Sequence, residues 1–156
     1  MIFLIFVGAD LMNAALAMTQ VPNQLAATVG GWGLSPYAVV AAILVFYVIL
    51  GAVMDELSML LLTIPIFFPM VMGLDFGMSK ELTAIWFGIM VLMTVGFGLI
   101  APPVGLNVYV VNSMAKNVPM GESYKGVMPF LASDVIRTLL LLFFPIIPLW
   151  LVRYVS

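Results

Sequence analysis

The chain has 156 residues, of which 65% are apolar and 8% are charged, and its formal net charge is −2. Soluble globular domains carry roughly 25% charged residues, so this composition indicates a helical membrane protein with several spans. The sequence contains no cysteine and no histidine. Disulfides, thiolate metal sites and histidine-based proton relays are therefore excluded, and the chain has no block of basic residues that would favour nucleic acid.

The first apolar segment, residues 2–19, predicts a transmembrane helix. Because the chain begins abruptly inside this apolar segment, we expect it to be a piece of a longer protein. Residues 20–36 contain Pro22, the pair Gly30-Gly31 and Pro36, which are turn-forming residues. We therefore expect a short interfacial segment between membrane spans there.

Two apolar runs, Tyr37–Met54 and Leu57–Leu74, flank the acidic pair Asp55-Glu56. They can be two full spans joined by a surface turn, or two arms of a re-entrant hairpin whose tip reaches the membrane interior. The turn lacks the lysines and flanking polar residues of a surface loop, and Pro65 and Pro69 are expected to break up the second arm. The residues alone leave the two interpretations about equally supported.

The run from Leu82 to Ala115 contains no Asp, Glu, Lys or Arg. Ser79 predicts the N-cap of its helix, with Glu81 in the first turn. A continuous helix over this run would be about 50 Å long, whereas the hydrocarbon core of a bilayer is about 30 Å thick. One straight span is therefore excluded.

Three glycines and two adjacent prolines lie in the middle of that run, in the stretch Gly96-Phe97-Gly98-Leu99-Ile100-Ala101-Pro102-Pro103-Val104-Gly105-Leu106-Asn107. Proline supplies no N–H, and Pro103 disfavours the α conformation at the residue before it. We therefore expect a discontinuous helix over residues 82–115, unwound within the bilayer. Unwound backbone at this depth is tolerated where it is buried or lines a cavity, and it commonly holds an ion or an anionic substrate.

The remainder of the chain predicts a polar loop over residues 116–125 and a final transmembrane helix over residues 126–153. Asp134 and Arg137 are three residues apart, a spacing that predicts a local ion pair.

The order and spacing of these motifs resemble the C-terminal part of the large membrane subunit of TRAP transporters (tripartite ATP-independent periplasmic transporters, the DctM-like branch). The resemblance covers nearly the whole chain and rests on Gly51–Asp55, Pro65, Pro69, Gly73–Asp75, Gly98–Asn107, Pro129-Phe130 and Leu149–Leu151. It implies an all-α polytopic membrane protein that forms one inverted repeat of an elevator-type transporter. It favours the re-entrant interpretation, with a hairpin over residues 37–72 followed by the broken helix over residues 82–115.

The resemblance also implies a function. The chain would be the C-terminal portion of a sodium-coupled permease of the bacterial inner membrane that imports small organic acids, such as C4-dicarboxylates or sialic acid. A periplasmic solute-binding protein would deliver the substrate, a small membrane subunit would complete the complex, and the missing N-terminal half of the permease would supply the other repeat. We expect no cofactor besides sodium, no enzymatic activity and no nucleic-acid partner. The competing hypothesis is a small, non-transporting membrane scaffold or regulatory subunit.

Backbone carbonyls and side-chain oxygens at the hairpin tip and the helix break predict a sodium site. Its candidates are Gly51, Asp55, Thr94, Gly98, Pro102 and Asn107. The N-terminus of the second half-helix presents unpaired N–H groups to a substrate carboxylate, which gives the substrate-binding candidates Pro103, Val104 and Gly105. Structural interpretations compete: Asp55 can cap a helix, Thr94 can bond within its own helix, and Asn107 can satisfy carbonyls of the break.

Overall fold

The computed structural model describes residues 2–31, 33–102, 105–115 and 118–155, and within these ranges the regular structure is helical, without strands. The helices are α1 (Ile2–Thr19), α2 (Val21–Gly31), α3 (Pro36–Gly51), α4 (Glu56–Met72), α5 (Lys80–Gly98), α6 (Leu106–Met114), α7 (Met120–Phe143) and α8 (Ile146–Val155). The expectation of an all-helical protein is therefore confirmed.

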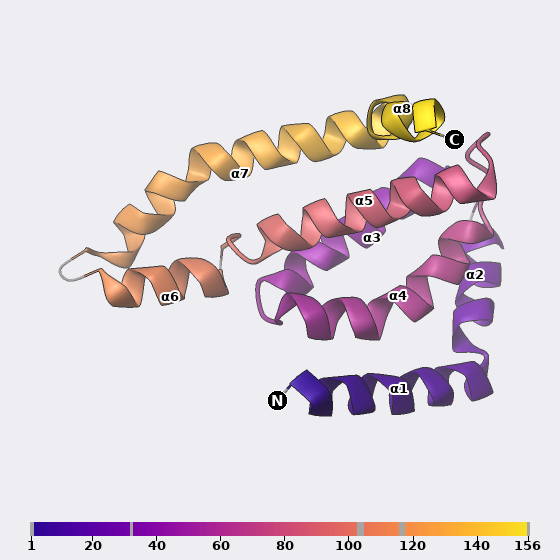
Figure 1. Ribbon diagram of the computed structural model, residues 1–156, viewed down its shortest axis with the longest axis horizontal. Coiled ribbons are helices and arrows are strands. Elements are labelled where there is room, and N and C mark those ends of the chain that lie inside the picture. The colour runs from indigo at the N-terminus through magenta and orange to yellow at the C-terminus, as the bar shows by residue number, and fades with distance from the viewer. Residues whose placement is uncertain (1, 32, 103–104, 116–117, 156) are drawn as a thin grey trace.

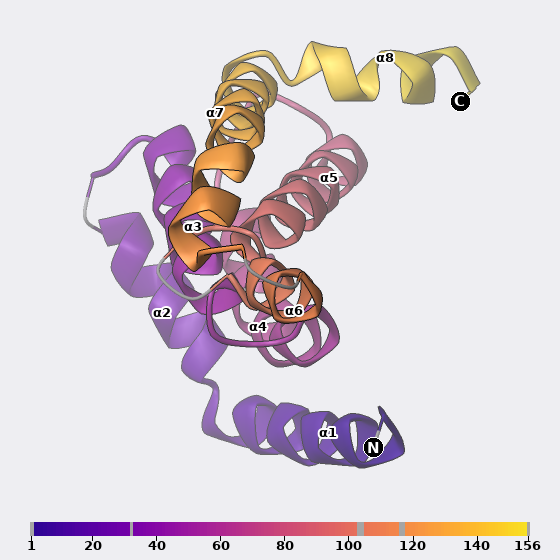
Figure 2. The same ribbon diagram turned by 90° about the vertical axis from the view of Figure 1, so that its left-hand side faces the viewer.

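Helices α3, α4 and α5 lie together at the centre of the molecule (Figure 1), and each contacts the other two. Helix α2 stands across the end of this group and packs on α4, while α1 runs back beside α4. Helices α7 and α8 cover α5 from the other side, so that α1 and α8 lie on opposite sides of the centre (Figure 2). The long α7 continues past the central helices and meets α6 there.

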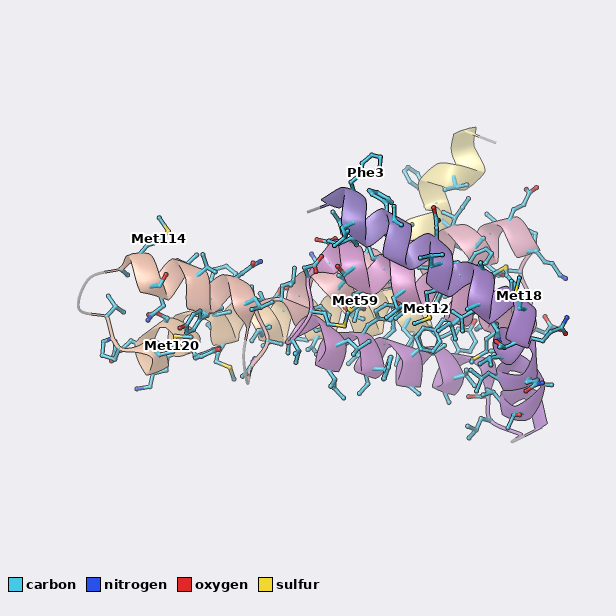
Figure 3. The ribbon with its side chains drawn as sticks, turned by 90° about the horizontal axis from the view of Figure 1, so that it is seen from below. Phe3, Met12, Met18, Met59, Met114 and Met120 are labelled. Atoms are coloured by element: carbon cyan, nitrogen blue, oxygen red, sulfur yellow. The ribbon has the colours of Figure 1, made fainter. Side chains whose placement is uncertain are left out.

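The core lies between α3, α4 and α5 and is filled by large side chains. Tyr47, Met59 and Trp86 are fully buried in it. Seen from below, Met59 lies among the central helices, whereas Phe3 and Met114 lie at the outside (Figure 3). The ring of Trp86 makes edge-to-face contacts with Tyr37 and with Phe76, at centroid distances of 6.0 and 5.3 Å. These contacts fix the N-terminal half of α5 against α3 and the loop after α4.

Two of the described helices, α5 and α7, are long and apolar enough to cross a membrane, and α1, α3 and α4 are shorter apolar helices. Large apolar side chains are exposed along α1 and α7, where water would disfavour them and lipid would not. These features are those of a helical membrane protein.

Helix α4 corrects one expectation. Pro65 and Pro69 were expected to break up the second arm of the hairpin, but both lie inside the continuous helix Glu56–Met72. A proline in a membrane helix removes one donor, and neighbouring helices and local adjustments can compensate for that loss. Here α1, α2 and α5 all pack on α4 and support it.

The end of the chain corrects two others. The stretch 116–125 was expected to be a loop, but α7 already begins at Met120, directly after Pro119. Residues 126–153 were expected to be one helix, but α7 ends at Phe143 and α8 begins at Ile146. Pro145 is the cause, because it disfavours the α conformation at Phe144, whose φ and ψ are −120° and 73°.

Candidate functional site

The turn between α3 and α4 lies beside the break between α5 and α6 (Figure 1). The contact is made by two glycines. A Cβ atom on Gly51 would lie 3.1 Å from the Gly98 Cα atom, and a Cβ atom on Gly98 would lie 3.3 Å from the Gly51 Cα atom. Only residues without a side chain allow two helix backbones to approach so closely. The structure thus brings together the two segments that the sequence nominated for a sodium site.

Helices α3 and α5 both end at this contact, α3 at Gly51 and α5 at Gly98. The last carbonyl groups of a helix lack intrahelical partners and carry the negative end of the helix dipole. Two such ends side by side give a region of negative potential made of backbone oxygens. A cation is favoured there.

The break lies between the end of α5 at Gly98 and the start of α6 at Leu106. Pro102 and Pro103 cannot donate to the carbonyls of Gly98 and Leu99, four residues earlier, so the sequence leaves these two carbonyls without their helical partners. The structure supplies other donors: the Ala101 N–H donates to Gly98 at 3.1 Å, and the Asn107 N–H donates to Leu99 at 3.2 Å. The second bond closes the loop and sets the start of α6.

Other carbonyls near the tip and the break lack a backbone donor among the described residues. Within the described ranges, no backbone N–H donates to the carbonyl oxygens of Gly51, Ala52, Ile100 or Ala101. The carbonyls of Ile100 and Ala101 lie against Gly105, where a Cβ atom would be 3.2 Å from each oxygen. Both carbonyls fall within the stretch Gly98–Pro102, whose carbonyls the sequence nominated for the sodium site.

Gly105 is buried and occupies the N-cap position of α6 with φ at 49°, in the left-handed region. This conformation and the two adjacent carbonyls both require glycine. Of the substrate-binding candidates, Gly105 is at the break. Pro103 and Val104 lie outside the described residues.

Asp55 is exposed in the turn between α3 and α4 and is the N-cap of α4. Its Oδ2 atom accepts a hydrogen bond of 3.0 Å from the Ser58 N–H. A carboxylate has two oxygens and several lone pairs, so this cap leaves acceptor capacity for a cation. The side chain therefore serves the helix and remains available to a ligand.

Thr94 is less well placed. It is fully buried one helical turn before Gly98, and its hydroxyl donates to the Met90 carbonyl at 2.8 Å. The side chain lines an apolar cavity of about 270 Å³ between α3, α5 and α7. This hydrogen bond within α5 agrees with the alternative interpretation of Thr94, in which its hydroxyl serves its own helix and not an ion.

The remaining candidates lie at the surface of the break. Pro102 is in the turn and exposed, and Asn107 is exposed in the first turn of α6. No group of three or more acidic residues gathers among the described residues. Any cation held here is therefore coordinated mainly by backbone oxygens and a few neutral or single-carboxylate side chains, which suits a monovalent ion better than a transition metal.

The chain is similar to known proteins of one family. The family described as "Tripartite ATP-independent periplasmic transporter, DctM component" matches residues 1–147. A protein of Haemophilus influenzae named as a TRAP transporter large permease is 34% identical over 152 residues, which are 94% of this chain and 36% of that protein. The C4-dicarboxylate TRAP transporter large permease protein DctM of Pseudomonas aeruginosa is 29% identical over 157 residues, 99% of this chain and 35% of that protein.

A third relative is the sialic acid TRAP transporter large permease protein SiaM of Vibrio cholerae, 26% identical over 144 residues, which are 91% of this chain and 32% of that protein. The chain thus spans about a third of the length of the curated relatives it matches. The three relatives carry the names of transport proteins and not of enzymes. No solved structure matches the chain. By its match over residues 1–147, the chain belongs to the DctM component family of tripartite ATP-independent periplasmic transporters.

Proposed function

We propose that the chain is the C-terminal portion of a sodium-coupled permease that imports small organic acids across the bacterial inner membrane. The observation that carries the proposal is the glycine contact between Gly51 and Gly98, which unites the ends of α3 and α5 at the helix break. The converging helix ends and the carbonyls of Ile100 and Ala101 form the cation site. Asp55, four residues after Gly51 in the tip, contributes a carboxylate.

The substrate carboxylate docks at the start of α6, where Gly105 and its neighbours Pro103 and Val104 precede the first turn. The N-terminus of a helix offers N–H groups and the positive end of the dipole. Sodium at the carbonyls and a carboxylate at this end would neutralise each other, so each ligand strengthens binding of the other. This is the basis for coupling uptake of the acid to the sodium gradient.

The turn between α3 and α4 is the tip of a re-entrant hairpin, and the repeat moves in an elevator-like manner. The names of relatives suggest C4-dicarboxylates or sialic acid as substrates. A periplasmic solute-binding protein, a small membrane subunit and the N-terminal half of the permease complete the transporter. Sodium is the coupling ion, and no other cofactor takes part.

Uptake by the completed complex in liposomes tests this function. We expect radiolabelled succinate or sialic acid to enter only when the binding protein is present and sodium is higher outside. Replacing sodium by potassium should abolish uptake. If the complex transports at the same rate in potassium, sodium coupling is wrong. If neither acid enters although the complex is assembled, the non-transporting scaffold becomes the better interpretation.

Asp55 gives the sharpest test of the cation site, because its two roles can be separated. Asp55→Asn keeps a side-chain oxygen for the Ser58 N–H but removes the charge, so the sodium concentration for half-maximal uptake should rise about tenfold while stability stays near the parent value. Asp55→Ala removes the cap as well, which should lower stability by about 1 kcal/mol.

Ser79→Ala is the matched control, because Ser79 caps α5 in the same way through the Leu82 N–H. It should reduce stability without changing the dependence on sodium. If Asp55→Asn leaves the dependence of uptake on sodium unchanged, Asp55 is not part of the cation site and serves only as the N-cap of α4.

A further inference from the structure

A polar contact crosses the hairpin one turn before its tip, inside an otherwise apolar core. The hydroxyl oxygens of Tyr47 on α3 and Thr63 on α4 lie 2.7 Å apart. The two side chains are 0% and 4% exposed. Among the described residues, this pair forms a side-chain hydrogen bond between the two arms, and it lies near the point where α3 meets the helix break.

The direction of the hydrogen bonds follows from the neighbours. The Thr63 Oγ1 atom also lies 2.7 Å from the Met59 carbonyl oxygen, which can only accept, and Figure 3 shows Met59 among the central helices. The single proton of Thr63 therefore goes to Met59, and the Tyr47 hydroxyl donates to Thr63. Both hydroxyl protons are used, so the two consecutive hydrogen bonds from Tyr47 to Thr63 and from Thr63 to Met59 need no water.

The backbone of Tyr47 also lies against the end of α5. A Cβ atom on Gly98 would lie 3.4 Å from the Tyr47 carbonyl oxygen. The ring of Tyr47 packs edge-on against Phe67 of α4, at a centroid distance of 5.7 Å. One residue thus touches α4 by its side chain and the end of α5 by its main chain.

We propose that Tyr47 and Thr63 are positioning residues that hold the tip of the hairpin in register with the helix break. Their consequence for transport rests on the proposed function, because that function places the ligands between tip and break. A hydrogen bond between buried hydroxyls resists sliding and splaying of the two arms, whereas apolar contacts tolerate such shifts. Loss of the bond leaves the arms folded but lets the tip drift relative to Gly98.

The chain offers matched controls for both residues. Thr83 is also 4% exposed and its hydroxyl donates to the Ser79 carbonyl, four residues earlier, but it makes no hydrogen bond to another helix in the part of the chain that the structure describes. Tyr37 packs its ring in the same core, against Phe76 and Trp86, and its hydroxyl makes no hydrogen bond with the described residues. Thr83→Val and Tyr37→Phe therefore remove the same kind of hydroxyl group but leave the hydrogen bond between Tyr47 and Thr63 intact.

The first measurement is uptake of succinate or sialic acid by the assembled complex. Tyr47→Phe and Thr63→Val should each raise the KM for the acid and the half-maximal sodium concentration about three- to tenfold, with the maximal rate per folded transporter less affected. The double variant should be no worse than either single one, because both remove one bond. Thr63→Ser keeps the hydroxyl and should behave like the parent, as should both controls.

The second measurement does not depend on transport. The chain has no cysteine, so spin labels can be placed at Val53→Cys in the tip and Leu92→Cys on α5, whose native side chains are 65% and 57% exposed. The distribution of distances between the labels should broaden in Tyr47→Phe and Thr63→Val and stay narrow in both controls.

The outcomes are separable. If the parent complex takes up neither acid but the distances broaden, the proposed function fails and the positioning role of the pair stands. If the distances stay narrow, or if the controls broaden them equally, the positioning role is overturned. A loss of thermal stability with unchanged KM and unchanged distances would also overturn it, because the bond would then serve folding alone.

Discussion

Proline causes two helix interruptions in this molecule, and they differ in whether the backbone carbonyls beside the interruption receive another hydrogen-bond donor. Between α7 and α8, Pro145 removes the N–H that would pair with the Leu141 carbonyl. The indole Nε1–H of the fully buried Trp86, on α5, donates to that carbonyl at 3.0 Å. This junction is closed, because a distant side chain replaces the missing donor.

Between α5 and α6 the outcome is the opposite. The carbonyls of Gly98 and Leu99, which Pro102 and Pro103 leave without their helical donors, are paired locally. Within the described ranges, those of Ile100 and Ala101 receive no backbone N–H and lie against Gly105. A structural junction satisfies its polar groups inside the chain, since unpaired groups in a membrane are costly. The proposed cation site uses the acceptors that lack a backbone donor among the described residues of the α5–α6 junction. Three sets of variants test the difference between the two junctions.

The largest effect is expected from Gly98→Leu, which pushes α5 away from Gly51 and opens the α5–α6 interruption. Overpacking of this kind costs about 1–3 kcal/mol or more, and uptake should fall at least about tenfold. Initial rates per assembled complex and thermal unfolding in detergent measure the two effects. Gly88→Leu is the control, because Gly88 lies in the same helix with no atom within 4 Å of a Cβ. Equal behaviour of the two variants would contradict the importance of the contact.

A smaller effect is expected from Gly105→Ala, which places a methyl group on the Ile100 and Ala101 carbonyls. A left-handed non-glycine residue costs about 1–3 kcal/mol of strain, so the break should shift and the half-maximal sodium concentration should rise several-fold. Gly77→Ala is matched in strain, since φ is 69° there, but it has open space around it. Gly77→Ala should change stability alone. The assignment fails if both variants alter sodium dependence alike.

The smallest effect on transport is expected at the closed junction. Trp86→Phe leaves the Leu141 carbonyl unpaired and should lower stability by about 1–3 kcal/mol without changing the dependence on sodium. Pro145→Ala returns a backbone N–H to α7, so the loss in the double variant should be smaller than the sum of the single losses. Chemical unfolding of the four proteins gives this coupling energy. Strict additivity would show that Trp86 acts by packing and not through the carbonyl.

Much of the fold could be predicted from local sequence. The N-caps at Asp55 and Ser79 are observed, each accepting from the N–H three residues later. The ion pair of Asp134 with Arg137 is present at 2.6 Å. The double proline interrupts the helix as expected. All of these depend on residues within a few positions of each other, which is the range over which sequence patterns are informative.

Other prolines show where such reasoning stops. Pro65, Pro69 and Pro129 lie inside helices, whereas Pro145 lies at a junction. Each removes one donor, and the sequence does not say whether a neighbour replaces it. For Pro145 the replacement comes from Trp86, which donates across 55 residues of sequence to Leu141.

The sequence predicted a helical, apolar protein with a helix over residues 82–115 that is interrupted within residues 96–107, because hydrophobicity and missing N–H groups are properties of the local chain. The packing of the helices brings Gly51 to Gly98 and Tyr47 to Thr63, and within the described ranges it leaves the Ile100 and Ala101 carbonyls without a backbone donor. The physical reason is that pairing of polar groups between helices depends on how the helices pack, and packing brings together residues that no short window of sequence contains.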